Sequence, residues 1–186
     1  KIVTTPFFHI SGSVAGFLMC LWAGLKLVIM HKWNARRAVE LVDKEKVSHF
    51  SGVPTMTAEL IEAAADIGSS LQYLRRVDSG GSKRPPAQVD LLAKSIPHAL
   101  PGNGWGMTET GGLGISARGP EYIKYPDSSG RLQPPLQEMR VVDEQGRDVP
   151  RGEVGELVIK SVTIMRCYLN QMEESAKVLR DGWLHT

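Results

Sequence analysis

The chain has 186 residues, of which 42% are hydrophobic and 23% charged, and its 22 basic and 20 acidic side chains leave a formal net charge of +2. This composition is typical of a soluble globular domain, and a chain of this length can bury a core of its own. The basic pairs Arg36–Arg37, Arg75–Arg76 and Lys83–Arg84 are far apart in the sequence. We therefore expect solvated faces rather than a basic stripe, and no nucleic-acid partner.

The apolar stretch over residues 12–30 is the one place where a membrane span could be suspected. It is interrupted by Lys26 and contains three glycines. We expect a buried helix over 13–23 and a strand over 26–30, and no transmembrane span. The only cysteines, Cys20 and Cys167, lack metal-ligand spacing, which favours a reduced, cytoplasmic protein.

Strand and helix signals then alternate along the chain. Asn34 can cap a helix, and Pro54 suits a first helical turn, where its missing N–H costs nothing. We predict strands over 26–30, 47–52, 74–81 and 98–106, and helices over 35–46, 54–66 and 85–95. This alternation predicts an α/β fold with a mostly parallel sheet covered by helices on both faces.

The pattern changes after about residue 127. A connector rich in proline, glycine and serine over 125–135 precedes β-rich runs over 139–161, with a short helix predicted over 173–180. We expect 1–126 to be part of an α/β nucleotide-binding subdomain. We expect 127–186 to be part of a small β-barrel-like subdomain.

Two glycine-rich stretches, DSGGSK at 78–83 and GNGWGMTETGG at 102–112, follow predicted strands. Ligands of open parallel sheets bind beyond the carboxyl ends of the strands. Gly102, Gly104 and Gly106 permit positive φ and would let a ligand lie against bare backbone.

Side chains in the second stretch could contact a nucleotide at its base and at its phosphates. The ring of Trp105 could stack on a base, the hydroxyl of Thr108 could bind a phosphate oxygen, and the carboxylate of Glu109 suits Mg²⁺. A structural turn around a half-buried tryptophan explains the same residues equally well. The chain has no GxxxxGK[ST] phosphate loop, and no GxGxxG opens a helix as in dinucleotide oxidoreductases.

The segment GWGMTET resembles the motif usually written YGMTE in the adenylate-forming superfamily of acyl-CoA synthetases, luciferases and peptide-synthetase adenylation domains. The rest of the chain carries further segments in family order: PFFHISG, VSHFSGVPTMTAELI, RRVDSGGSKRPP and GEVGELVIKSVTIMRCYLNQMEESAKVLRDGWLHT. Together these segments cover nearly the whole chain, so the resemblance is specific for the family, although it does not specify the substrate.

The resemblance implies a two-step reaction. A carboxylic acid attacks the α-phosphate of ATP to give an acyl-adenylate and pyrophosphate, and the thiol of CoA then displaces AMP. We expect an acyl-CoA synthetase for a fatty or related hydrophobic acid, with ATP, Mg²⁺ and CoA as its small-molecule partners. A homodimer is one assembly such an enzyme could form.

By position, the resemblance implies roles for individual residues. Trp105 would stack on adenine, Thr108 would bind the α-phosphate, and Glu109 would hold Mg²⁺. The remaining nucleotide contacts would come from Gly80, Gly81, Ser82, Asn103, Gly104, Gly106 and Met107.

Further positions resemble acyl- and coumarate-CoA ligases. His9 would lie at the mouth of the acyl pocket, with Ser11 and Ser13 along the same wall. The alternative for His9 is packing among the neighbouring apolar side chains. Lys32 would contact CoA, and a solvated surface lysine is the alternative there.

Three positions depart from the family pattern: Trp105 replaces tyrosine, Lys83 replaces proline and Cys167 replaces glycine. We expect the pyrophosphate loop to precede Lys1. A ribose-binding aspartate and a C-terminal domain with a catalytic lysine should follow Thr186, so the chain would be an internal part of a longer protein and inactive alone. The alternatives are a non-catalytic nucleotide-binding module of the same fold and an adenylation domain that serves another acceptor.

Overall fold

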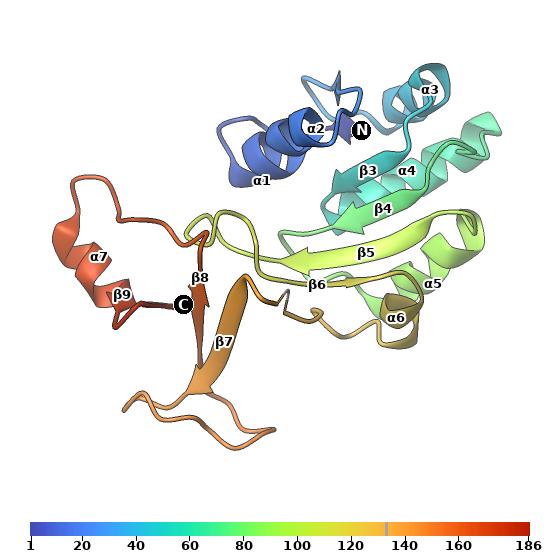
Figure 1. The fold of residues 1–186 in the computed structure, drawn as a ribbon. Helices are drawn as coiled ribbons and strands as arrows, with labels where there is room; N and C mark the ends of the chain where they lie inside the picture. The colour runs from blue at the N-terminus through green and yellow to red at the C-terminus, as the bar shows by residue number, and fades with distance from the viewer. Residues whose placement is uncertain (133) are drawn as a thin grey trace. The chain divides into compact units, whose positions relative to one another are not determined.

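The computed structural model describes residues 1–132 and 134–186, which form two compact units (Figure 1). Unit 1 consists of residues 1–105 and 115–131, and unit 2 of residues 106–114 and 132–186. The predicted connector over 125–135 contains residue 133, which lies outside the described residues.

Unit 1 is built on a six-stranded sheet with the order β2-β1-β3-β4-β5-β6. The first five strands run parallel, and β6 pairs antiparallel with β5. The strands are β1 (Ile2–Val3), β2 (Val28–Ile29), β3 (His49–Gly52), β4 (Arg76–Ser79), β5 (Leu100–Trp105) and β6 (Ile115–Arg118).

Three helices of unit 1 begin where the sequence predicts. Helix α3 (Ala35–Glu45) is capped by Asn34, whose Oδ1 accepts from the Arg37 backbone N–H at 2.8 Å. Helices α4 (Pro54–Ile67) and α5 (Pro86–Ser95) each have proline in the first turn, where no intrahelical donor is lost.

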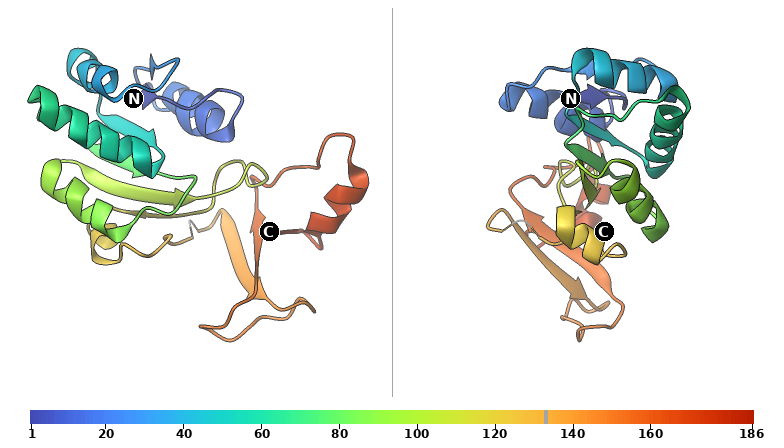
Figure 2. Two further views of the ribbon diagram at one scale, coloured as in Figure 1. Left: turned by 180° about the vertical axis from the view of Figure 1, so that it is seen from behind. Right: turned by 90° about the vertical axis from the view of Figure 1, so that its right-hand side faces the viewer.

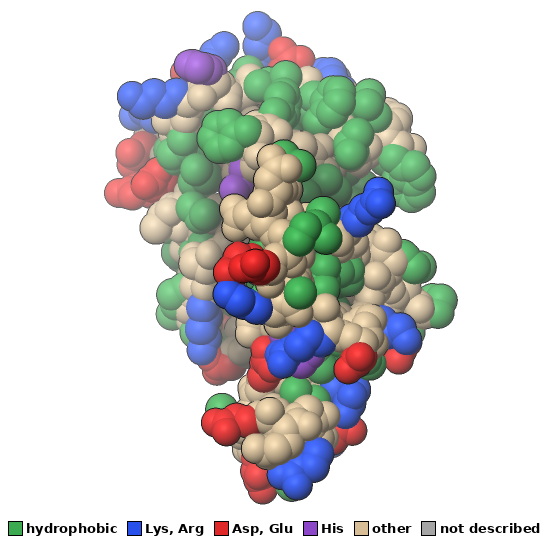
Figure 3. Space-filling model, turned by 90° about the vertical axis from the view of Figure 1, so that its left-hand side faces the viewer, with side chains coloured by type: hydrophobic (Ala, Val, Ile, Leu, Met, Phe, Trp, Pro, Cys, Tyr) green, Lys and Arg blue, Asp and Glu red, His purple; other side chains and the backbone are tan. Residues whose placement is uncertain are grey.

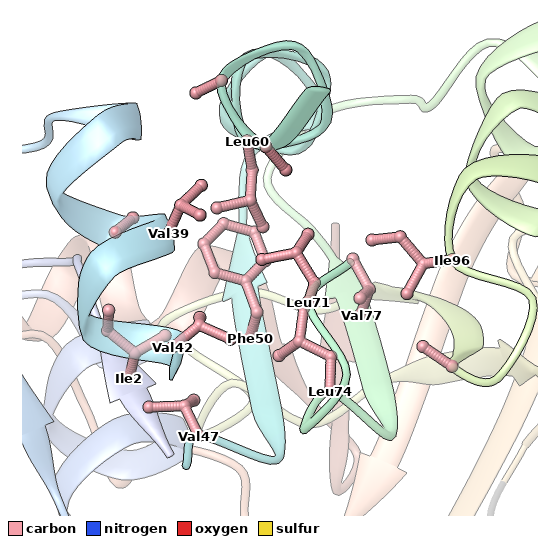
Figure 4. Packing of buried hydrophobic residues seen from close by; sticks show 14 of the residues in the cluster. Ile2, Val39, Val42, Val47, Phe50, Leu60, Leu71, Leu74, Val77 and Ile96 are labelled. Carbon is pink, nitrogen blue, oxygen red and sulfur yellow. The ribbon is translucent and has the colours of Figure 1, made fainter. Parts of the chain in front are cut away.

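These helices lie side by side on one face of the sheet (Figure 2) and bury the main core of unit 1 (Figure 4). Ile2, Phe50 and Val77 point to this face from neighbouring strands, and Val39 of α3 and Leu60 of α4 meet them. All five side chains are fully buried. Their burial fixes the sheet under the helices, because about 25 cal/mol is gained per Å² of apolar surface removed from water.

The opposite face carries the N-terminal helical segment beside β1. It consists of α1 (Ile10–Gly12), a π-helical turn η1 (Ser13–Leu18) and α2 (Met19–Trp22). The approach is close, since a Cβ at Gly16 would lie 2.9 Å from Cγ1 of Val3.

The expectation that this helix is buried is wrong for most of its side chains. Phe17, Leu18 and Leu21 are 41–64% exposed, and Trp22 is 86% exposed. Hydrophobic side chains form a broad area on the face drawn in Figure 3. No helix among residues 1–132 and 134–186 has the length and apolar character needed to cross a membrane.

Unit 2 contains a four-stranded antiparallel sheet with the order β7-β8-β10-β9. Its strands are β7 (Gln137–Val142), β8 (Glu156–Ser161), β9 (Leu179–Arg180) and β10 (Trp183–His185), and helix α7 (Met172–Val178) precedes β9. Val142, Val158, Ile159 and Leu184 form its buried apolar side chains.

The α/β fold and the second, antiparallel sheet are thus confirmed. Two elements of unit 1 are additions to the sequence prediction: the antiparallel edge strand β6 and helix α6 (Gly119–Lys124). Both are short and directly follow the glycine-rich stretch, and Gly119–Pro120 is typical of a turn. Tyr122 of α6 packs with Val89 of α5 and Ala117 of β6 in a second small core.

Arg84, which lies in the loop between β4 and α5, is an unexpected buried cation with an exposed fraction of 1%. Its guanidinium lies 3.5 Å from the Thr57 hydroxyl, and its Nε and one terminal nitrogen have no hydrogen-bond partner among the described residues. Burial lowers the pKa of Arg84 below its ordinary value, and the nearby Tyr122 opposes that shift. An unpaired buried charge destabilises a fold.

We expect Arg84→Met to stabilise the protein by about 1 kcal/mol or more, because an apolar side chain of similar length removes the desolvation cost. Denaturant unfolding should show a higher midpoint with an unchanged slope. Arg36→Met, at an exposed position of α3, is the matched control and should change the midpoint little. A lower midpoint for Arg84→Met would mean that the guanidinium has a partner that the described residues do not supply.

Candidate functional site

The carboxyl ends of β3, β4 and β5 bring the two glycine-rich stretches together. In the parallel register Gly52 pairs with Ser79, and Ser79 with Asn103. Beyond Ser79 the chain turns at Gly80, whose N–H donates to the Gly52 carbonyl at 3.3 Å. A Cβ at Gly80 would lie 3.3 Å from the carbonyl oxygen of Gly104. Residues 80–82 and 103–105, predicted as nucleotide contacts, are therefore neighbours.

Two buried polar atoms lie at this edge of the sheet. The Asn103 Oδ1 and the Ser79 Oγ are buried and have no hydrogen-bond partner among the described residues. A buried polar atom left unsatisfied costs about 1–3 kcal/mol. An amide oxygen in need of a donor beside bare glycine backbone fits an amino-bearing heterocycle, and adenine carries such an amino group.

Trp105 is the last residue of β5 and pairs with Ile115 of β6. It is half-buried, so part of its ring is covered by protein and part is exposed. The antiparallel pairing of β5 with β6 thus fixes the backbone of Trp105, whose ring is predicted to stack on a base.

Gly102, Gly104 and Gly106 do not use the positive φ that glycine permits; within this stretch positive φ occurs at Gly111 and Gly112. At Gly102 and Gly106, neighbouring atoms leave little room for a side chain. A Cβ at Gly102 would collide with the Asp78 carboxylate, and one at Gly106 would lie 2.7 Å from the Gly112 carbonyl oxygen.

Residues 106–114 belong to unit 2, where they form a compact loop. Gly112 N–H donates to the Met107 carbonyl at 2.8 Å. The fully buried Thr110 accepts from the Met107 N–H and donates to the Met107 carbonyl, both at 3.0 Å. These bonds hold the predicted phosphate ligand Thr108 on the outside of the loop, where it is exposed.

The segment after β8 forms three hydrogen bonds to this loop. The Thr163 hydroxyl donates to the Thr110 carbonyl at 2.8 Å, and the Met165 N–H donates to the Glu109 carbonyl at 2.7 Å. The Tyr168 hydroxyl donates to Oε1 of Glu109 at 2.8 Å. Glu109 is thus held by a backbone bond and a side-chain bond.

The hydrogen bond to Glu109 raises the pKa of the Tyr168 phenol above its ordinary value, so Tyr168 keeps its proton and donates. Tyr168 is itself fixed, because its N–H donates to Oγ of the buried Ser175 at 2.8 Å. Oε2 of Glu109 has no hydrogen-bond partner among the described residues.

A single carboxylate of this kind fits magnesium. Mg²⁺ is usually bound by one or two carboxylates, with substrate phosphates and waters completing the octahedron. No group of three or more histidine, cysteine, aspartate or glutamate side chains that could hold a metal ion occurs in the described part of the chain. The chain would therefore supply Glu109 and leave the remaining positions to the nucleotide and to water.

The predicted site residues divide between the two units. Gly80, Gly81, Ser82, Asn103, Gly104 and Trp105 belong to unit 1, and Gly106, Met107, Thr108 and Glu109 belong to unit 2. The structure brings each set together within its own unit.

His9, Ser11 and Ser13 form a third group at the start of α1. The His9 ring nitrogen Nδ1 lies 2.7 Å from the Ser11 hydroxyl and accepts from the Ser11 N–H at 3.2 Å, and Ser13 Oγ donates to the His9 carbonyl at 3.1 Å. His9 is exposed and caps the helix, so it is not packed in the core. Lys32 lies on the exposed loop between β2 and α3.

Sequence reasoning missed the residues that hold the loop. Tyr168 lies 59 positions from Glu109 and Thr163 lies 53 positions from Thr110. Tyr168 falls in a segment used for the resemblance, but no sequence spacing pairs it with Glu109.

Known proteins match the chain over most of its length. The family described as AMP-binding enzyme matches residues 2–169. The chain is 31% identical over 186 residues to 4-coumarate–CoA ligase 5 of Oryza sativa subsp. japonica, covering 97% of this chain and 34% of that protein. It is 32% identical to 4-coumarate–CoA ligase CCL1 of Humulus lupulus with the same coverage. The chain thus spans about a third of the length of these relatives.

Solved structures give the same fold. A protein of Rhodopseudomonas palustris, provisionally described as a long-chain-fatty-acid CoA ligase, has a TM-score of 0.88 at 29% identity over 98% of this chain and 44% of that one. The Bacillus subtilis o-succinylbenzoate CoA synthetase solved with ATP and magnesium has a TM-score of 0.87 at 23% identity, over 100% of this chain and 37% of its own. The motif order, the fold and the matched residues lead to one conclusion: the chain belongs to the AMP-binding enzyme family.

Proposed function

We propose that the protein is an adenylate-forming CoA ligase that activates a hydrophobic carboxylic acid, fatty or aromatic. The observation that carries the proposal is the edge of the sheet in unit 1, where the backbones at Gly80 and Gly104 approach each other. Beside them lies the buried Asn103 Oδ1, which has no hydrogen-bond partner among the described residues. The coumarate–CoA ligases and the provisional fatty-acid CoA ligase among its relatives support the acid class. The free thiols Cys20 and Cys167 support a cytoplasmic location as part of the proposal.

In the first step, a carboxylate oxygen of the acid attacks the α-phosphorus of ATP, and the bond to the β-phosphate breaks to release pyrophosphate. Trp105 stacks on the adenine, and Asn103 accepts a hydrogen bond from the adenine amino group. The exposed Thr108 hydroxyl donates to an α-phosphate oxygen. A magnesium ion on Glu109 would offset the negative charge of the phosphates.

In the second step, the sulfur of CoA attacks the acyl carbon, and the acyl–phosphate bond breaks to release AMP. Lys32, exposed between β2 and α3, is suited to a phosphate of CoA. His9 would lie at the entrance to the acyl site with Ser11 and Ser13. The apolar side chains of α1 to α2, several of them exposed, offer contact to a hydrophobic acid.

The experiment that tests the proposal is pyrophosphate exchange with a panel of acids, using the complete protein encoded by the reading frame that contains the chain. Long-chain and medium-chain fatty acids and 4-coumarate separate the two acid classes. Exchange that depends on one of them supports the proposal. Binding of AMP without exchange for any acid would point instead to a non-catalytic nucleotide-binding module.

Replacing Trp105 by alanine should weaken AMP binding by about 1–3 kcal/mol, since the stacking contact is lost. Titration calorimetry measures the change, and Trp105→Phe, which keeps an aromatic face, should retain most of the affinity. Trp22→Ala removes an 86% exposed indole and is the control. Equal affinities for Trp105→Ala and the unaltered protein would remove the stacking role from Trp105.

Glu109→Gln should lower the rate of pyrophosphate exchange at least tenfold, in the range of about 10–100-fold seen when groups around a metal are altered. The amide keeps the shape of the carboxylate but not the charge that attracts the cation. Binding of the acid, measured separately, should change less than twofold. If exchange survives intact, Glu109 does not hold the metal.

A further inference from the structure

The hydroxyl of Tyr168 is the only side-chain group among the described residues that hydrogen-bonds to the Glu109 carboxylate. It reaches Oε1 at 2.8 Å from the segment between β8 and α7. The ring is half-buried, and the backbone of Tyr168 is tied to Ser175 of α7. The Ser175 hydroxyl in turn donates to the Gln171 carbonyl at 2.7 Å. The phenol therefore approaches Glu109 from a fixed support.

The backbone of Glu109 is held from the same segment. Met165 N–H donates to the Glu109 carbonyl, and Thr163 donates to the carbonyl of the next residue, Thr110. With the backbone fixed, the remaining freedom of Glu109 lies in its side-chain torsions. A hydrogen bond to Oε1 restrains those torsions and leaves Oε2 to a further ligand.

We propose that Tyr168 is a positioning residue, which orients the Glu109 carboxylate so that Oε2 meets the nucleotide-bound divalent cation. This inference rests on the proposed function. Mg²⁺ demands near-ideal octahedral geometry, and carboxylates that ligate metals are themselves oriented by hydrogen bonds. Tyr168 does not touch the substrate or the metal and acts through Glu109.

The alternative is that the hydrogen bond only strengthens the loop. Thr163, Met165 and Thr110 already supply several bonds that do not involve the phenol. Loss of the Tyr168 hydroxyl should therefore leave the loop folded. A purely structural role and a positioning role thus predict different results for metal binding and for stability.

The test uses Tyr168→Phe in the complete protein, since this change removes only the hydroxyl. The readout is Mn²⁺ binding in the presence of α,β-methylene-ATP, measured by electron paramagnetic resonance. We expect the dissociation constant of Mn²⁺ to rise on the order of tenfold. The Mg²⁺ concentration that gives half-maximal pyrophosphate exchange should rise by a similar factor. Metal-free AMP binding and the thermal midpoint should stay unchanged.

Tyr125→Phe is the matched control, because Tyr125 is 51% exposed and lies in unit 1. The double variant Tyr168→Phe/Glu109→Gln gives a second test through a mutant cycle. If Tyr168 acts through the carboxylate, the phenylalanine change should have no further effect on Mn²⁺ binding once Glu109 is glutamine. A full additional loss in that background would overturn the proposal.

The results separate the two levels of inference. An unaltered protein that shows no exchange with any acid refutes the proposed function, whatever the variants do. An active protein whose Tyr168→Phe variant binds Mn²⁺ within twofold of the original refutes the positioning role alone. A parallel loss of Mn²⁺ binding, AMP binding and thermal stability would show a structural role and also overturn the proposal.

Discussion

The parallel pairing of β3, β4 and β5 is the constraint on which the site of unit 1 depends. Because all three strands end at the same edge, the residues that follow β4 meet those at the end of β5. The apolar side chains at Phe50 and Val77 set this register by burying one face under α3, α4 and α5. A shift by one residue would turn Asn103 and Ser79 to the opposite face, and the polar edge would be lost.

The fold and the meeting of the two glycine-rich stretches could be predicted from the sequence because both depend on local patterns. Proline at helix starts, Asn34 as a cap and glycine-rich stretches after strands are short-range signals, and the helices begin close to where those signals fall. The hydrogen bond between Tyr168 and Glu109 could not be predicted, because it joins positions that are distant in the sequence and leaves no periodicity. The exposed N-terminal helix and the buried Arg84 were missed for a related reason, since burial depends on tertiary neighbours.

The eleven-residue stretch over 102–112 serves both units. Residues up to Trp105 complete a strand in the sheet of unit 1, and the residues after it form the loop of unit 2. The ring proposed to stack on the base and the carboxylate proposed to bind the metal thus lie four positions apart in sequence but are supported by different units. The ring depends on the β5–β6 ladder, and the carboxylate depends on the segment that follows β8.

A glycine-rich run is usually taken as flexible, but two glycines of this stretch lie against close neighbours. Asp78 occupies the space beside Gly102, and the backbone of Gly112 occupies the space beside Gly106. At both positions glycine is therefore favoured by the atoms beside it rather than by freedom of movement, and most strongly at Gly106, where the neighbouring atoms are backbone. In a library of random variants, position 106 should therefore accept little besides glycine even though it is exposed, whereas the exposed position Leu113 should tolerate substitution.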